Sequence, residues 1–289
     1  ILGPRINAGG RVGKSTHGAN LLLNKNPKDT FKLAVELNSY NKERQILESE
    51  LLKKILNTEN KNNVDPVIIL YGENWHEGII GIIAARLKEK YNKPAIVISI
   101  NKGIGKGSGR SIHGFDLGST IIGAVQSGLL TKGGGHKMAA GFTIEADKID
   151  EFREFVFRKF KSINMNLEEK KNYYFDAEIS PSAINNNFFE KINKLAPFGS
   201  GNPEPRFVVR DVKLVNSKIV GEKHIKIVLV GSDSTTLKAI SFNSVETELG
   251  SHLLKKNMKS FDIAGKLSLN EWRGQKNVEF IIDDLSVIK

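Results

Sequence analysis

Ser108 and Arg110 are the side chains of this sequence best suited to bind an anion. They flank Gly109 in a glycine-rich run, GIGKGSGRS, so in an extended backbone both would point to the same face. A hydroxyl beside a planar guanidinium is a good receptor for a terminal phosphate, because the guanidinium presents parallel N–H donors. We therefore predict a phosphate contact here. The alternative is a surface hairpin whose arginine only pairs with an acid.

A second glycine-rich run, GGGHKMAAGF, opens with three successive glycines and a histidine. Because glycine lacks a Cβ, both runs are predicted to be loops in which the backbone can adopt positive φ and approach a ligand closely. The histidine could donate a hydrogen bond to an anion or a base edge. Together the runs predict a phosphate cradle whose second half consists of Gly133, Gly134, Gly135 and His136.

The first residues, ILGPRINAGGRVG, form a third glycine-rich and basic segment. We predict a loop that offers Arg5, Asn7 and Arg11 to a ligand, although an ordinary helix-entry turn has the same composition. His76 follows Trp75 at the expected start of a helix. It could contact a ligand or only cap that helix, and the residues leave both open.

Trp272 and Arg273 occupy an expected turn near the end of the chain. An aromatic ring and an arginine in a turn could stack on nucleic-acid bases. A hairpin tip anchored by its tryptophan is an equal alternative.

A complete catalytic apparatus is not recognisable in the sequence. The HExxH, GxSxG and Walker A patterns are absent. Asp283 and Asp284 are adjacent acids, but a solvated turn is expected there. The histidines are scattered among glycines with hardly any neighbouring aspartate, so the residues predict no metal site.

The composition favours a polyanionic partner. The 289 residues carry a formal net charge of +11, with an isoelectric point near 9.6. A lysine-rich proteome would give the same balance, so composition alone does not decide. No apolar run is long enough to span a bilayer, so no membrane association is expected. The absence of cysteine fits a cytoplasmic origin, and an opening without methionine suggests a fragment of a longer protein.

The first half of the chain is predicted to be an α/β domain reached through a long helix. Apolar residues recur at helical spacing from Phe31 to about Lys61. Buried strands are expected at 67–71 and 94–100, and another from Phe142 to Ile144. Helices are expected at 76–91 and at about 115–128. A last helix is expected to begin after Asp147, which would cap it. Strands that alternate with helices indicate an α/β fold.

The second half reads as an all-β domain. Short alternating strands are expected from Tyr173 to Ile179 and at 206–215, 224–230, 237–242, 260–269 and 278–282, with one helix near 246–256. Five or so strands with one intervening helix suit an OB-type barrel. The alternation places Lys226 on the face opposite the core, although a solvated strand face explains a lone lysine equally well.

Five segments in this order resemble the bacterial RecJ family of single-strand-specific exonucleases: GPRINAGGRVG, NWHEGIIGIIAARL with KPAIVIS, GKGSGRSIHGFDL, GGGHKMAAGF and LAPFGSGNPEPRF. The resemblance covers nearly the whole chain. The triple-glycine-histidine motif is shared with the wider DHH phosphoesterase superfamily. The SGRS run combined with APFGSGNPEP is specific to RecJ-like proteins.

The resemblance implies a 5′→3′ exonuclease acting on single-stranded DNA in recombination and repair. Ser108 and Arg110 would receive the 5′ end, Arg11 would reach the scissile phosphate with Arg5 and Asn7, and His136 would line the cleft. In this family Mn²⁺ or Mg²⁺ is held by an N-terminal DHH domain whose ligand motifs do not occur here. We therefore expect no metal in this chain and little or no nuclease activity from it alone.

The resemblance also implies a division into four parts. Residues 1–27 would be the tail of the DHH domain, 28–62 a connecting helix, 63–165 the DHH-associated domain and 166–289 the OB domain. Single-stranded DNA with a 5′ end is the expected partner, a single-strand-binding protein is a candidate partner, and a monomer is expected. Two rival functions are a DHH-family phosphodiesterase of oligoribonucleotides or cyclic dinucleotides, and a non-catalytic DNA- or partner-binding module.

Overall fold

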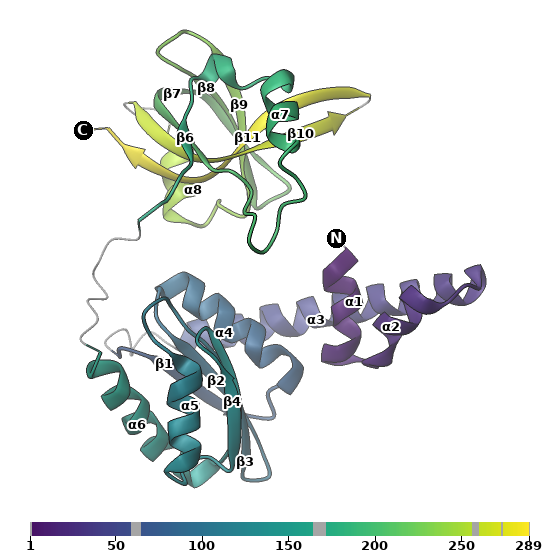
Figure 1. The fold of residues 1–289 in the computed structure, drawn as a ribbon, viewed down its shortest axis with the longest axis vertical. Helices are drawn as coiled ribbons and strands as arrows, with labels where there is room; N and C mark the ends of the chain where they lie inside the picture. Colours follow the sequence, from purple (N-terminus) through teal and green to yellow (C-terminus); the bar gives the residue numbers. More distant parts are fainter. Residues whose placement is uncertain (1, 59–64, 164–171, 256–259, 273, 289) are drawn as a thin grey trace. The chain divides into compact units, whose positions relative to one another are not determined.

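The computed structural model describes residues 2–58, 65–163, 172–255, 260–272 and 274–288. They divide into two compact units, Ile1–Glu169 and Lys170–Lys289, and each is described by itself (Figure 1). None of the helices in the described part is both long and apolar enough to cross a bilayer.

Three helices open the first unit: α1 (Leu2–Val12), α2 (Thr16–Leu23) and α3 (Pro27–Thr58). The long helix is confirmed, and it begins at a proline, whose missing N–H is not needed there. The loop predicted for the first residues is wrong, because they form α1. Pro4 falls in the first turn, where proline is tolerated. Gly9 lets α1 pack closely, since a Cβ there would lie 2.7 Å from the Lys14 carbonyl oxygen.

A five-stranded sheet forms the centre of the first unit. Its spatial order is β1-β2-β3-β5-β4. The strands are β1 (Ile68–Glu73), β2 (Ala95–Asn101), β3 (Ile104–Arg110), β4 (Lys132–His136) and β5 (Ala139–Glu145). β1 and β2 are parallel and the other pairs are antiparallel. The predicted α/β fold is confirmed.

Both glycine-rich runs are strands rather than the predicted loops. The first run is β3, and only Gly103, which precedes it, has positive φ. The triple glycine lies within β4, and none of Gly133, Gly134 and Gly135 has positive φ. Alternate glycines of β3 are needed for packing. A Cβ on Gly107 would lie 2.1 Å from the Phe142 ring, and one on Gly109 would lie 2.6 Å from Leu117.

Helices cover both faces of this sheet (Figure 1). α4 (Glu77–Tyr91) packs on β2 and β3, and its apolar side joins α3 in one core cluster. α5 (Leu117–Gln126) and α6 (Ile149–Lys161) contribute to a second cluster. The predicted Asp147 cap is wrong. That residue lies inside a short 3₁₀ turn, η1 (Ala146–Lys148), which supplies the first residues before α6.

The second unit is a closed five-stranded barrel. Its strands are β7 (Phe207–Val220), β8 (His224–Val230), β9 (Thr236–Ser241), β10 (Phe261–Trp272) and β11 (Gln275–Val287). The order is β7-β8-β9-β11-β10, and β10 pairs back with β7. β9 and β11 are parallel, and α8 (Glu248–Leu254) lies between the third and fourth strands in sequence. This is the Greek-key arrangement of an OB fold, which confirms the predicted barrel.

The segment before the barrel differs from the prediction. The expected strand from Tyr173 to Ile179 is reduced to β6 (Ala177–Glu178), which pairs with β7. η2 (Pro181–Ala183) and α7 (Asn186–Asn193) follow. α7 is too short to show a convincing helical period in the sequence. Asp283 and Asp284 lie in β11 rather than in a turn, and Asp283 is ion-paired with Arg206.

Candidate nucleic-acid-binding sites

β3 presents Ser108 and Arg110 on one face, as their spacing predicted, and this face is directed toward α4. The Arg110 Nη1 donates to the Ser108 Oγ at 3.3 Å and to the Gly109 carbonyl oxygen at 2.8 Å. The helix leaves room for both side chains only because it carries Gly81. A Cβ at that position would lie 2.9 Å from the Ser108 Oγ and 3.1 Å from the Arg110 Nη2.

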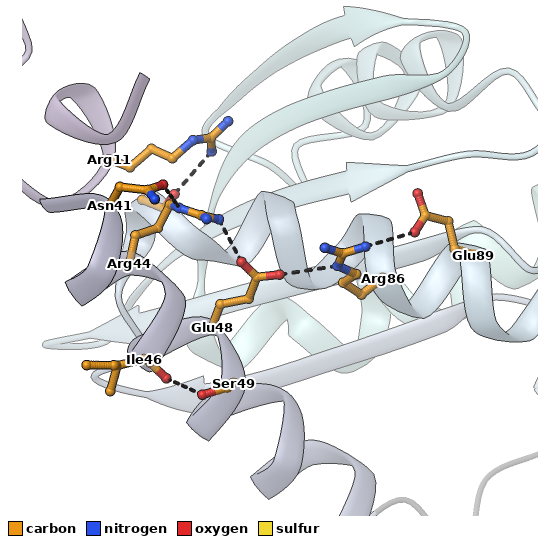
Figure 2. Close-up of polar contacts among 9 residues, drawn as sticks. Arg11, Asn41, Arg44, Ile46, Glu48, Ser49, Arg86 and Glu89 are labelled. Atoms are coloured by element: carbon orange, nitrogen blue, oxygen red, sulfur yellow. Dashed lines mark hydrogen bonds and ion pairs between the residues drawn. The ribbon is translucent and has the colours of Figure 1, made fainter. Parts of the chain in front are cut away.

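Arg11 reaches the same region from the last turn of α1. Its Nη1 donates to the Gly78 carbonyl oxygen at 3.3 Å, a contact drawn in Figure 2. The close approach of the two helices requires Gly78, since a Cβ there would lie 1.9 Å from the Arg11 carbonyl oxygen. Gly78 belongs to the first turn of α4, where the helix dipole adds partial positive charge.

Arg11 and Arg110 form no ion pair with an acidic side chain in the described part of the chain. Burial, together with the nearby charge of Arg11, lowers the pKa of Arg110. Across the described residues, neither guanidinium is ion-paired with a carboxylate; the polar contacts found for Arg110 are the two on β3, and that found for Arg11 is the Gly78 carbonyl. An anion bound between them would relieve their mutual repulsion.

The sheet register brings His136 to the same side as Arg110. Arg110 pairs with Ala139, and Ala139 pairs with His136, so the three residues lie in one row across β3, β5 and β4. Directly opposite residues of antiparallel strands point to the same face. Two strand spacings place the His136 Cα about 10 Å from that of Arg110. The imidazole is exposed, and its Nδ1 accepts a hydrogen bond from the Met138 N–H at 3.3 Å.

The neighbouring row is a bare glycine floor. Ser108 pairs with Gly141, and Gly141 pairs with Gly134. A Cβ on Gly134 would meet no heavy atom within 4 Å, and one on Gly141 would meet only a backbone oxygen at 3.7 Å. Gly133 and Gly135 lack this freedom, because a Cβ on either would collide with the sheet or with Ile121. The glycines thus leave an open surface between the serine, the arginine and the histidine. We name these five residues, Ser108, Arg110, Gly134, His136 and Gly141, the glycine-floor site.

The structure also shows where the other predicted site residues of the first unit lie. The His76 Nδ1 accepts from the Gly78 N–H at 3.0 Å, so His76 caps α4. The Arg5 Nε donates to the Asn38 Oδ1 at 2.9 Å and holds α1 against α3. Asn7 is exposed, and it lies one turn from Arg11 on the same face of α1.

An ion-pair chain fixes α3 against α4, as Figure 2 shows. Glu48 of α3 accepts from the Arg44 Nη1 at 2.7 Å and from the Arg86 Nε of α4 at 3.2 Å. The Glu48 and Arg44 side chains are 12% and 13% exposed, whereas Arg86 is 56% exposed. Buried Asn41 accepts a further hydrogen bond from Arg44 at 3.4 Å. The chain holds the helix that carries Gly78 and Gly81.

At the end of the glycine floor, Asp116 caps α5. Its carboxylate accepts a hydrogen bond from the Ser119 N–H at 3.0 Å, and this bond is the main cause of its lowered pKa. Gly118 of the same helix allows close packing, because a Cβ there would lie 2.9 Å from the His136 backbone. The first turn of α5 therefore supports the strand end that carries the histidine.

The barrel of the second unit carries a groove of about 720 Å³ on its outer surface. Strand alternation directs apolar residues of β8 such as Ile225 and Ile227 into the core and Lys226 outward, as predicted. The groove is lined by three lysines, three asparagines, two valines and one glutamate: Lys218, Lys226, Lys238, Asn216, Asn270, Asn277, Val220, Val228 and Glu279. It crosses the face of strands β8 and β9 that OB folds use for oligonucleotides.

Of the residues that line this groove, the sequence singled out only Lys226. The outward positions of the other strands follow the same alternation, but a register was needed to show that they share one face. Trp272 ends β10 opposite Gln275. Its side chain, and all of Arg273, lie outside the described residues, so the predicted stacking contact has no structural description.

A metal-binding cluster is not found in the described ranges, where no three histidine, cysteine, aspartate or glutamate side chains gather. The described residues therefore offer no cluster of three such side chains to hold a divalent metal.

Comparison with known proteins assigns both units. Residues 65–162 match the DHHA1 domain family, and residues 175–284 match the RecJ OB domain family. The chain therefore carries a DHHA1 domain followed by a RecJ OB domain. The RecJ resemblance noted in the sequence is thus confirmed.

RecJ relatives extend over nearly the whole chain. It is 32% identical to the single-stranded-DNA-specific exonuclease RecJ of Dickeya dadantii over 294 residues, covering 98% of this chain and 50% of that protein. It is 30% identical to RecJ of Bacillus subtilis, covering 99% of this chain and 36% of the relative. The chain therefore spans half or less of the length of these relatives.

A solved RecJ structure has the same fold. RecJ of Thermus thermophilus in complex with Mn²⁺ superposes with a TM-score of 0.79 at 26% identity, covering 99% of this chain and 40% of that chain. The corresponding Mg²⁺ complex gives a TM-score of 0.77.

Proposed function

We propose that this RecJ-family chain is the substrate-binding part of a 5′→3′ exonuclease that degrades single-stranded DNA in recombination and repair. The observation that carries the proposal is the pair Arg11 and Arg110, two guanidinium groups near each other with no carboxylate partner in the described structure. Such a pair suits a terminal phosphate, which brings two negative charges and several acceptor oxygens. The names of the relatives supply the substrate class.

The Ser108 hydroxyl and the Arg110 guanidinium bind the 5′-phosphate in this proposal. Arg11 approaches from α1 and stabilises negative charge on the phosphoryl oxygens, a charge that grows in the transition state. His136 and the glycine floor face the sugar and base of the terminal nucleotide, where the absence of Cβ atoms allows close approach. A pocket that recognises a chain end gives the enzyme its direction.

A divalent cation, Mn²⁺ or Mg²⁺, would supply the activated water in the whole enzyme. The described residues do not form a ligand cluster, so we assign no ligand among them and derive no step through the ion. We propose further that residues 1–27 belong to a DHH domain, that 28–62 connect it to the DHH-associated domain at 63–165, and that 166–289 form the strand-binding OB domain. The chain by itself is expected to bind DNA with little or no hydrolysis.

The barrel groove holds the incoming strand. Its lysines neutralise phosphates, and its asparagine amides can hydrogen-bond base edges. The match of residues 175–284 to the RecJ OB domain favours this function over a phosphodiesterase of oligoribonucleotides or cyclic dinucleotides.

Fluorescence anisotropy with two forms of one oligonucleotide tests the 5′-phosphate site. The wild-type chain should bind the 5′-phosphorylated strand more tightly than the 5′-hydroxyl strand by about 5- to 150-fold, or about 1–3 kcal/mol for a charge-assisted contact. Arg110→Ala should abolish that difference. Arg158→Ala, which removes an exposed arginine of α6, is the matched control and should preserve it.

Equal affinity for the two strands, with no effect of Arg110→Ala, would contradict the phosphate site. If the wild-type chain prefers the 5′-phosphorylated strand and Arg110→Ala keeps that preference, the phosphate is bound at another site. Metal-dependent release of nucleotides by the purified chain would overturn the expectation that it only binds.

A further inference from the structure

The barrel groove contains a carboxylate that a phosphate-binding surface does not need. Glu279 of β11 lies among the three lysines of the groove, and only 8% of the residue is exposed. A buried charge in a basic surface costs free energy unless it is paired, so its position calls for a partner.

That partner is Lys226. The Lys226 Nζ lies 3.1 Å from the Glu279 Oε1, and the side chains are 38% and 10% exposed. The other two lysines of the groove, Lys218 and Lys238, have no ion-pair partner in the described structure. The groove therefore carries two available ammonium groups and one that is neutralised in place.

The strand register places two of the three lysines directly opposite each other. Lys218 of β7 lies directly opposite Lys226 of β8, and like charges opposite each other repel. Glu279 precedes Phe280, which pairs with Ala239, so the register places it beside Lys238 of β9. Its ion pair is nevertheless formed with Lys226 of β8. The carboxylate thus reduces repulsion in the empty groove, but it also repels any phosphate that enters.

We propose that Glu279 limits the affinity of the groove for single-stranded DNA by holding Lys226 out of phosphate contact. The inference rests on the proposed function of the groove and assigns this residue a specific part in it. A strand shortened by an exonuclease must move along its binding surface after each cut. A groove with a neutralised centre binds through Lys218 and Lys238 and releases the strand more readily.

The salt dependence of binding measures the number of lysines that contact phosphate, since each contact on a single strand adds about 0.7 to the slope of log K against log salt. The probe is a 5′-hydroxyl oligothymidylate of about 16 nucleotides, the upper site size of one OB fold, which lacks the terminal phosphate. Glu279→Gln in the full chain should bind it about two- to fivefold more tightly, the effect of one partly exposed charge contact. The slope should steepen by about 0.7.

The steeper salt dependence expected of Glu279→Gln should require Lys226. In a Lys226→Met background, Glu279→Gln should leave the slope unchanged, whereas an exposed glutamate elsewhere in the barrel would act in either background. Lys226→Met alone should lower the wild-type slope by less than half as much as Lys238→Met does. This second comparison tests the inference even where Glu279→Gln lowers the melting temperature.

Failure of the proposed groove function and failure of the proposed role of Glu279 would give different results. If Lys218→Met and Lys238→Met change neither affinity nor slope, the strand does not use this groove and its proposed function is wrong. If they lower the slope while Glu279→Gln matches the wild type, or if Lys226→Met and Lys238→Met lower it equally, the groove binds DNA and the role of Glu279 is overturned.

Discussion

At the scale of single residues, two sets of arginines in the described structure differ in their partners. Arg44, Arg86, Arg206 and Arg210 are paired with carboxylates and serve to hold elements together. Arg11 and Arg110 contact only carbonyl and hydroxyl oxygens among the described groups. A guanidinium that is held in place but not neutralised is prepared for an external anion, because binding requires neither rotamer search nor displacement of a carboxylate.

Spacing predicted that Ser108 and Arg110 share a face, because alternation in a strand is a local property. The approach of Arg11 could not be predicted in the same way. It depends on the contact of α1 with α4 at Gly78, which joins residues 67 positions apart. The helix cap formed by His76 also needed coordinates, since only they show the Gly78 N–H donating to its ring.

The glycine floor gives a residue-scale prediction. Gly134→Val should not destabilise the fold, since a Cβ there meets no atom within 4 Å and valine favours a strand. It should nevertheless reduce discrimination for the 5′-phosphorylated strand by placing a side chain on the open glycine row that leads from Ser108 across Gly141. Anisotropy binding and thermal melting measure the two effects.

Gly133→Val is the matched control for that experiment. A Cβ at Gly133 would lie 2.7 Å from Ile121 and 2.9 Å from Phe142, so this variant should melt at a lower temperature. A Gly134→Val protein with wild-type stability and wild-type discrimination would show that the floor does not receive the nucleotide.

At the scale of elements, glycine explains both the successes and the failures of the sequence reading. Strands made of branched apolar residues, such as β2 and β8, were predicted within a residue or two. β3 and β4 were mistaken for loops, because their glycines serve close packing and open surface rather than positive φ. α1 was missed for the same reason. A single sequence does not separate these uses of glycine, whereas the sheet register does.

The ion-pair chain between α3 and α4 supports an element-scale prediction. Glu48→Ala should lower the free energy of unfolding of the first unit by about 3 kcal/mol, because it leaves the mostly buried Arg44 without its counter-ion. Arg86→Ala should cost less than about 1 kcal/mol, since Arg86 is largely exposed. Trp75 fluorescence during urea denaturation, in a Trp272→Phe background, reports this unit.

Equal costs for the two variants would contradict the assignment of Glu48 as the buried centre of the chain. A functional consequence is also expected. Glu48→Ala should weaken 5′-phosphate discrimination as α4 shifts, while Arg86→Ala should leave it intact.

At the scale of the whole molecule, two separate surfaces can each bind one part of the same ligand. In the proposed function, the glycine-floor site of the first unit binds the strand end, and the barrel groove of the second unit binds the rest of the strand. The units are joined by one passage of the chain. Linked sites raise the affinity for a ligand that engages both, because the second contact becomes intramolecular. The net charge of +11 adds a diffuse attraction that weakens as salt is added. This attraction changes with strand length in a different way from the linked contribution, because it does not require the strand to reach a second site.

Oligonucleotide length separates the linked contribution from diffuse charge. A 5′-phosphorylated strand of about 4 nucleotides, near the smallest site size of an OB fold, should bind through the glycine-floor site. A strand several times longer should bind more tightly by about 10- to 1,000-fold in divalent-free buffer. The double variant Lys218→Met/Lys238→Met should abolish most of that gain without changing affinity for the short strand, because both lysines lie in the groove. The double variant Lys191→Met/Lys194→Met removes the same charge from the α7 region, outside the groove, and should retain the gain. If both pairs reduce it equally, long strands are held by diffuse charge rather than by the barrel groove.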